Sequence, residues 1–291
     1  MAEKQTLSPA AALQISYIHP SRPIWSGITP RWFLKVLPFV SIESGVYRVN
    51  QAKAEFDVIH QSPIDKDLPK TFADYDLKPK EIGLSSIHTV LRLNNVSGDL
   101  YNAPHNQLKE QTRLIVEALR EEQEMQILEH PTTGLVKQVD PSMTMNAGGK
   151  PTPDAMDDLL SLVWEKPAFF LAHPKAIAAF GKECTARGIA TDTAGMLGAP
   201  FVTWRGVPIF PSNKLALTKD GKTNILLMRV GEEDQGVIGI NQVGIPGEIQ
   251  PGLSMRINGI DAQGCTNYMF VLYYGLAVLS PSALGLMKCS L

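Results

Sequence analysis

The side chains best suited to chemistry in this chain are its histidines, and their spacing is the first test for a metal or catalytic site. The six histidines never fall at metal-ligand spacing; they are His19, His60, His88, His105, His130 and His173. His19, His130 and His173 each precede a proline, near an expected helix boundary, where capping or local hydrogen bonding is the expected role. The histidines therefore predict no metal centre.

Carboxylates gather in two places. The run Glu-Glu-Gln-Glu at 121–124 lies in a long predicted helix, and we expect it to form a solvated face rather than a catalytic pair. Asp154, Asp157 and Asp158 stand at the start of another predicted helix, where the helix dipole favours negative charge. Neither group needs a catalytic explanation.

The cysteines and the known catalytic motifs point the same way. Cys184, Cys265 and Cys289 make neither a disulfide framework nor a zinc pattern, so we expect small buried side chains in a reducing compartment. The sequence has no P-loop, Rossmann fingerprint, nucleophile elbow or metalloprotease helix. We predict no catalytic residue, no cofactor and no metal. A soluble metabolic enzyme with an unrecognised active site stays open as an alternative from another class.

The composition is that of a globular protein that meets other protein surfaces. The chain has 291 residues, 44% of them hydrophobic and 19% charged, with a formal net charge of -2. That charged fraction is below the roughly 25% usual in soluble domains, and the balanced charge argues against a nucleic-acid binder. The N-terminus lacks a signal peptide, and Gly275 and Pro281 interrupt the apolar run at 268–287. We expect a cytoplasmic protein without a membrane span, while association with a membrane surface stays open.

The first 44 residues are typical of an extended arm. Proline recurs through them and disfavours long helices and sheet interiors. Such an arm cannot bury Trp25, Trp32 and Phe33 on itself, so we expect these side chains to contact a neighbouring domain or subunit. One short helix is predicted from Thr29, as its N-cap, to Leu37.

Residues 45–150 are expected to hold a projection and a long helix. Two strands, at 46–50 and 86–96, flank a polar stretch and predict a hairpin-like arm. The stretch from Pro104 to His130 is the longest helical pattern and would span about 35–40 Å. Its apolar stripe is incomplete, which predicts a spine that packs on several sides.

The rest of the chain is typical of a compact mixed α/β region, a returning strand and a tail. Helices are predicted from Thr152 and from His173, the second ending at Gly188. Residues 188–200 are predicted as a loop of small residues, and 257–260 as a hairpin turn. Strands are predicted at 168–172, 206–210, 225–230 and 268–279.

This order of elements resembles the HK97-type phage capsid fold, which is α+β. Within 169–217, FFLAHPKAIAAFGKECTARG and GVPIFPSNKLAL carry the likeness. The segments ITPRWFLKVLPFVSIESGVYRVNQ and EQEMQILEHPTTGLV are more specific and resemble the family 2 encapsulins, which are bacterial shell proteins. The resemblance implies five parts: an N-arm at 1–44, an E-loop at 45–100, a P-domain at 101–150 with a spine helix at 104–130, an A-domain at 151–266 that includes P-domain strands, and a C-terminal P-domain strand with a tail at 267–291.

The resemblance also implies a function. The chain would be a non-enzymatic shell protein that self-assembles into an icosahedral nanocompartment of 60 subunits (T=1) around a cargo enzyme, without nucleic acid. The chain has no room for a cyclic-nucleotide-binding insertion, and the subtype without one commonly encloses a cysteine desulfurase of sulfur metabolism. Pyridoxal phosphate is then expected only in that cargo. A phage or prophage major capsid protein is the alternative with the same fold.

The small-residue loop carries one further expectation from the resemblance. In HK97-like shells the A-domain tips meet at the five-fold axis and can line a pore. Thr191, Asp192 and Thr193 would then surround that pore, with Asp192 supplying a ring of negative charge. An ordinary surface loop is the equal alternative.

Overall fold

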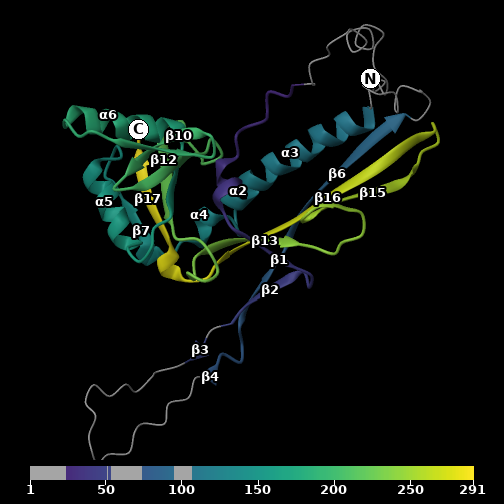
Figure 1. Ribbon diagram of the computed structural model, residues 1–291, viewed down its shortest axis with the longest axis horizontal. Helices are drawn as coiled ribbons and strands as arrows, with labels where there is room; N and C mark the ends of the chain where they lie inside the picture. Colours follow the sequence, from purple (N-terminus) through teal and green to yellow (C-terminus); the bar gives the residue numbers. More distant parts are fainter. Residues whose placement is uncertain (1–23, 51, 54–73, 95–106) are drawn as a thin grey trace, which may run out of the picture.

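Two β-sheets and one long helix set the shape of the molecule (Figure 1). The computed structural model describes residues 24–50, 52–53, 74–94 and 107–291. A rounded lobe holds a seven-stranded sheet, an elongated lobe holds a six-stranded sheet beneath the long helix, and a thin β-ribbon projects from their junction (Figure 1).

The six-stranded sheet is organised around its longest strand, β16. Its strands are β1 (Phe39–Ile42), β6 (Ser85–Asn94), β13 (Val237–Gln242), β14 (Glu248–Gln250), β15 (Leu253–Ile260) and β16 (Cys265–Val278). Strand β16 pairs antiparallel with β13, β15 and β6, and its register with β6 runs from Cys265 opposite Asn94 to Tyr274 opposite Ser85. The predicted strands at 86–96 and 268–279 therefore exist and lie side by side.

The long helix α3 (Gln107–Glu129) covers one face of that sheet. The fully buried side chains of Leu253, Phe270 and Leu272 pack with Leu119 of α3 in one cluster. The prediction of a spine helix is confirmed over 107–129, while residues 104–106 lie outside the described part of the chain.

The central strands of the seven-stranded sheet are buried on both faces. Its order is β7 (Thr144–Asn146), β17 (Leu284–Ser290), β12 (Lys222–Met228), β8 (Phe169–Ala172), β11 (Val207–Pro211), β10 (Ala199–Trp204) and β9 (Asp192–Met196). Side chains alternate between the faces: Ile225 and Leu227 pack with α5 (Pro153–Leu162) and α6 (Pro174–Ala186), whereas Leu226 and Met228 pack toward Phe33.

The starts of α5 and α6 follow the sequence prediction. The Thr152 hydroxyl accepts the Ala155 N–H at 3.2 Å, and Pro153 occupies the first turn. His173 Nδ1 accepts the Lys175 N–H at 3.1 Å, as a histidine at a helix boundary was expected to do. Gly188 follows α6 with φ +70°, a left-handed conformation that suits a helix stop.

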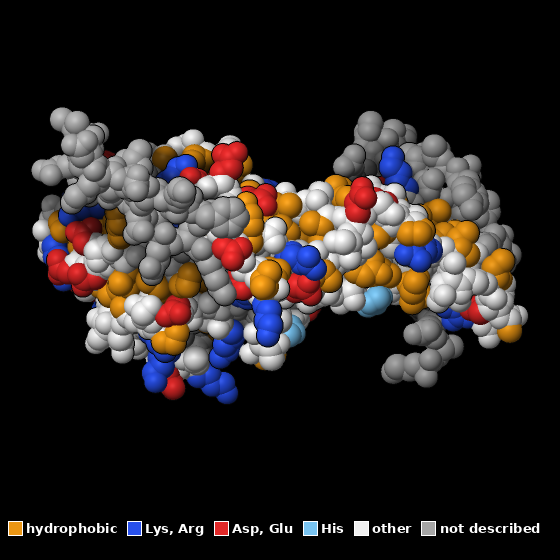
Figure 2. Space-filling view, turned by 90° about the horizontal axis from the view of Figure 1, so that it is seen from below, with side chains coloured by type: hydrophobic (Ala, Val, Ile, Leu, Met, Phe, Trp, Pro, Cys, Tyr) orange, Lys and Arg blue, Asp and Glu red, His pale blue; other side chains and the backbone are white. Residues whose placement is uncertain are grey.

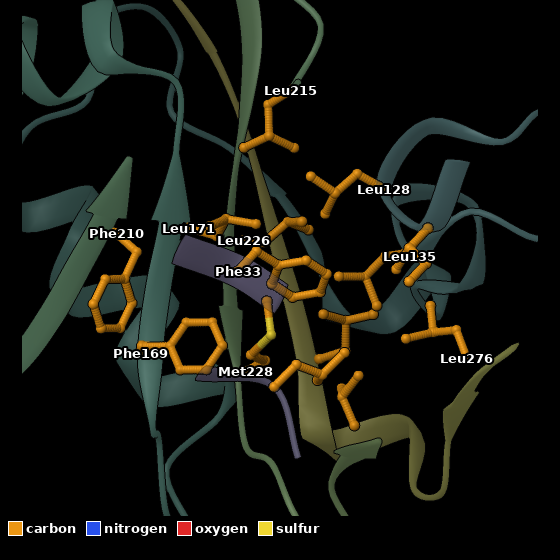
Figure 3. Packing of buried hydrophobic residues seen from close by; sticks show 14 of the residues in the cluster. Phe33, Leu128, Leu135, Phe169, Leu171, Phe210, Leu215, Leu226, Met228 and Leu276 are labelled. Atoms are coloured by element: carbon orange, nitrogen blue, oxygen red, sulfur yellow. The ribbon is translucent and has the colours of Figure 1, made fainter. Parts of the chain in front are cut away.

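From Trp32 onward, the N-terminal arm packs into the body of its own chain. Arg31 is left-handed (φ 48°), so helix α2 begins at Trp32 rather than at the predicted Pro30, and ends at Val36. Strand β1 then pairs in parallel with β13. Phe33 is fully buried, and Figure 3 shows its ring with Leu128, Leu226 and Met228 around it.

The projecting ribbon is paired differently from the prediction. Strand β2 (Val46–Val49) pairs with β5 (Lys80–Gly83), not with β6, and β3 (Ala52–Lys53) pairs with β4 (Asp74–Tyr75). Tyr47 anchors the root of the ribbon, because its hydroxyl donates to Glu232 Oε1 at 2.6 Å. Burial and this hydrogen bond to Glu232 raise the pKa of Tyr47 to about 12.

Two further expectations about the C-terminal half are wrong. Residues 284–290, predicted as a tail, form strand β17 and pair with β12 along its length. Residues 257–260, predicted as a hairpin turn, form an irregular stretch within β15, and the chain reverses at 261–264. Strands β7 and β17 join the sheet of β8, whereas β13 joins that of β16, so each sheet combines segments from both sides of the predicted part 151–266.

Candidate functional site

The three aromatic side chains predicted to touch a neighbour have different environments. Phe33 lies wholly inside its own chain, which contradicts the expected contact with another subunit. Trp32 is half-buried against Phe201 of β10, with ring centroids 5.1 Å apart, and the Lys35 ammonium lies 4.5 Å from its ring. Trp25 keeps 39% of its surface exposed and is the one of the three still free to meet another molecule.

A buried group of charged side chains holds the arm to α3. Glu117, Glu121 and Glu124 occupy one face of the helix, because residues spaced by three, four and seven share a face. With Thr29 and Arg31 of the arm and Lys214 of the loop after β11, they form what we call the charge cluster.

Glu121 is the centre of the charge cluster. Its carboxylate accepts the Thr29 N–H at 2.8 Å, the Thr29 hydroxyl at 2.8 Å and the Arg31 guanidinium at 2.9 Å. The same carboxylate accepts the Lys214 ammonium at 2.5 Å. Arg31 makes a second ion pair with Glu117. One helical side chain thus joins the arm, the helix and the seven-stranded lobe.

Lys214 is placed by the apolar residue that follows it. Leu215 is nearly fully buried beside Leu128 of α3 (Figure 3), and the Ala216 N–H donates to Glu129 at 2.9 Å. The loop is therefore fastened to α3 by the two residues that directly follow Lys214. The ammonium also donates to the Thr29 hydroxyl and lies 3.1 Å from Glu124.

The pKa values of the two carboxylates beside Lys214 are shifted in opposite directions. Burial alone would raise the pKa of Glu121, but the hydrogen bonds from Lys214 and from both groups of Thr29 outweigh it, and the net pKa is lowered. Burial dominates at Glu124 and raises its pKa despite Lys214, and Glu124 Oε1 has no hydrogen-bond partner among the described residues. Glu121 is thus a stabilised anion, and Glu124 is a disfavoured one.

The charge cluster corrects the expectation that the 121–124 run is a solvated face. Glu121, Gln123 and Glu124 are all buried, and Arg120 donates to Gln123 at 2.8 Å. The spacing of three acidic residues on one helix face was the available signal. The sequence alone did not reveal which cation would reach them, because Lys214 is 90 residues downstream.

The predicted pore residues are at the free edge of the seven-stranded sheet. Asp192 and Thr193 are exposed and belong to β9, which pairs only with β10, while Thr191 directly precedes the strand. The segment 188–200 is thus largely a β-hairpin and not the loop that its small residues predicted. Its tip is Leu197–Gly198, both with positive φ.

The remaining candidate groups have structural partners. Asp154 pairs with Arg187 at 2.6 Å, and Asp157 accepts from both Trp204 and Arg205. The three cysteines are free thiols inside the core. Within the described ranges, His, Cys, Asp and Glu form no group of three that could hold a metal ion, and no helix there is long and apolar enough to cross a membrane.

Comparison with known proteins then decides the family. Residues 44–289 match the family described as type 2A encapsulin shell protein, SrpI-like. The chain belongs to the type 2A encapsulin shell proteins. It is therefore a structural shell component rather than an enzyme, and it needs no cofactor of its own.

Individual relatives agree along nearly the whole chain. The type 2A encapsulin shell protein SrpI of Synechococcus elongatus is 44% identical over 98% of this chain and 94% of its own length. The shell protein of Mycolicibacterium paratuberculosis is 42% identical over the same shares. The cryo-EM structure of the holo-SrpI encapsulin complex from S. elongatus superposes with a TM-score of 0.84 at 42% identity, covering 98% of this chain and 96% of that chain.

More distant structures establish the fold independently. The capsid of a native GTA particle superposes with a TM-score of 0.65 over 98% of this chain and 100% of that chain, at 13% identity. The capsid structure of the cyanophage P-SCSP1u gives a TM-score of 0.61 at 10% identity, over 98% and 95% of the two chains. The predicted HK97 capsid-like fold is confirmed.

Replacing Lys214 with methionine should destabilise the encapsulin subunit strongly. Two buried carboxylates would lose their shared cation, and leaving a buried charge unpaired costs about 3–5 kcal/mol. Lys166→Met is the matched control, because Lys166 pairs with Asp234 at the surface, where such pairs contribute about 0–1 kcal/mol. Denaturant unfolding measures both variants, and equal losses would contradict a special role for Lys214.

The two carboxylates should respond oppositely to neutralisation. At pH 7, Glu121→Gln should lower the free energy of unfolding by about 1.5–3 kcal/mol, the usual contribution of a hydrogen bond to a charged group. Glu124→Gln should leave that free energy unchanged or raise it, because burial already disfavours the Glu124 anion.

The pH dependence of the free energy of unfolding tests whether the pKa of Glu121 is lowered in the folded state. A lowered folded-state pKa contributes stability above the ordinary glutamate pKa of about 4.3, and this is lost as pH falls through the folded pKa. The gap between wild type and Glu121→Gln should therefore close in acid. Unfolding curves from pH 7 to 3 test this, and a gap independent of pH would contradict the assignment.

Proposed function

We propose that copies of this chain assemble into a closed icosahedral nanocompartment of 60 subunits (T=1) that encloses a cargo enzyme in the bacterial cytoplasm. Membership of the type 2A shell family carries the proposal. The SrpI relative is an encapsulin complex in its solved form, at 42% identity over nearly the whole chain. The fold likeness to capsids supports a closed shell as the architecture.

The projecting ribbon supports assembly on physical grounds. A two-stranded ribbon is marginally stable by itself in water. This one also carries Tyr75 and Leu77 with 69% and 92% of their surfaces exposed. A neighbouring subunit would supply both a covering surface and the missing contacts.

The elongated lobe shows a second uncovered area. Figure 2 shows hydrophobic side chains at the surface of this part of the molecule. Val90, Ile257 and Ile260 are more than half exposed there. Apolar surface repeated on every copy favours association, and symmetry multiplies each contact.

The proposed cargo is a cysteine desulfurase of sulfur metabolism. The support is the subtype that the sequence resembles, which lacks a cyclic-nucleotide-binding insertion. Pyridoxal phosphate would belong to that cargo, and the shell would serve to enclose and separate the reaction.

Purification of the full chain tests the assembly. Size-exclusion chromatography with negative-stain microscopy should give uniform hollow particles without nucleic acid. Elution as a monomer, dimer or tetramer at every concentration would contradict the shell, and nuclease-protected DNA would point to a phage capsid. Mass spectrometry of proteins that co-purify from the native host should find a cysteine desulfurase, and particles without one would contradict only the cargo.

We also propose that Thr191, Asp192 and Thr193 line a pore at the five-fold axis. The exposed positions of Asp192 and Thr193 at the edge of the described sheet support this, and Thr191 directly precedes them. Asp192→Lys should reverse the ring charge and slow the entry of cations into the particle, measured by stopped-flow quenching of an enclosed dye. Glu233→Lys, at an exposed loop position, is the control, and equal flux in wild type and both variants would exclude the pore role.

A further inference from the structure

A group of lysines gathers at the end of the seven-stranded sheet where β12 begins and β17 ends. Five ammonium groups share this end and are all exposed; they belong to Lys150, Lys175, Lys182, Lys222 and Lys288. None of the five pairs with a carboxylate among the residues that the structure describes. We call these five residues the lysine surface.

Two hollows bring the five side chains together. Lys150, Lys175 and Lys182 line a hollow of about 290 Å³ together with Ala178, Ala179 and Leu291. Lys222 and Lys288 line a second hollow of about 540 Å³, whose wall also contains polar side chains; these are Asn146, Thr218, Asn224 and Ser290.

The hollows are adjacent, because the same backbone separates them. Gly149 lines the second hollow, and the next residue, Lys150, lines the first. The Ser290 N–H donates to the Gly149 carbonyl at 2.8 Å, and the Leu291 N–H donates to the Gly221 carbonyl at 2.9 Å. A single extended ligand can therefore reach lysines of both hollows.

The lack of counter-charges is unusual for this lobe. Arg187 pairs with Asp154 at 2.6 Å, and Lys166 pairs with Asp234 at 2.6 Å. The Arg205 guanidinium likewise pairs with a carboxylate at 2.9 Å. The chain as a whole is slightly acidic, with a net charge of -2. Five neighbouring cations with no described carboxylate within ion-pair distance thus form a local positive field that attracts an acidic partner.

We propose that the lysine surface binds an acidic peptide segment. The two hollows can receive carboxylate side chains, and the asparagine, threonine and serine side chains of the second hollow can hydrogen-bond a peptide backbone. A nucleic acid fits less well, because neither hollow is lined by a described arginine or aromatic residue. Arginine binds phosphate in bidentate fashion, and aromatic side chains stack on bases. The proposal goes beyond shell formation and does not depend on the identity of the cargo.

Fluorescence anisotropy tests the proposal with a fluorescein-labelled 12-residue peptide of alternating Glu and Ser. The double variant Lys182→Glu and Lys288→Glu, with one reversal in each hollow, should weaken binding about tenfold. The control double variant Lys137→Glu and Lys166→Glu makes the same change in net charge at exposed sites elsewhere and should alter binding less than about twofold. Added salt should weaken wild-type binding.

Three results would overturn the proposal. These are no binding to wild type, equal losses in the two double variants, and tighter binding of a 20-nucleotide single-stranded DNA than of the peptide. Particle formation is checked by microscopy for each variant, so failure of the shell is distinguished from failure of this surface. If charge reversal prevents folding, Lys182→Gln with Lys288→Gln replaces it, and an unchanged affinity in that variant would likewise contradict the proposal.

Discussion

A buried carboxylate must be surrounded by hydrogen-bond donors, and Glu121 meets this requirement with donors from two other parts of the chain. The arm supplies Thr29 and Arg31, and the loop of the seven-stranded lobe supplies Lys214. Each donor is far from Glu121 in sequence, so the anion is satisfied only when all three parts are in place. Glu121 therefore couples the placement of arm, long helix and lobe, in addition to the apolar contacts among Phe33, Leu128 and Leu215.

This arrangement separates what a subunit fixes internally from what it leaves for neighbours. Phe33 and β1 commit residues 33–42 to the core and to the six-stranded sheet. The ribbon of β2 and β5, the apolar positions on the elongated lobe and the β9 edge stay uncovered. The subunit thus has a body that its own chain holds together, and thin extensions whose surfaces are left for contacts with neighbouring subunits. Glu124 shows the cost of this construction, because the same lysine cannot fully satisfy a second buried anion.

Local sequence signals predicted most helices and strands, but they did not predict which strands pair with each other. The Thr152 and His173 caps, the long helix and the buried strand at 169–172 follow from residue type and periodicity. The pairing of β2 with β5, and of β17 with β12, depends on contacts between distant segments that no local pattern contains. The sequence predicted that Phe33 contacts a neighbouring domain or subunit, because the proline-rich residues around it are typical of an extended arm. In the structure, the short helix α2 directs the Phe33 ring into the core. The family resemblance gave the correct fold, and the charge cluster stayed hidden because acidic runs on helices are usually solvated.

Hydrogen exchange of the purified protein with and without Glu121→Gln tests the central claim most directly. If Glu121 joins the three parts, exchange should accelerate both in the arm peptide that contains Thr29 and in the loop peptide around Lys214, while the peptide covering β8 stays protected. Unchanged exchange in the arm and the loop, in a variant that still folds, would contradict the account.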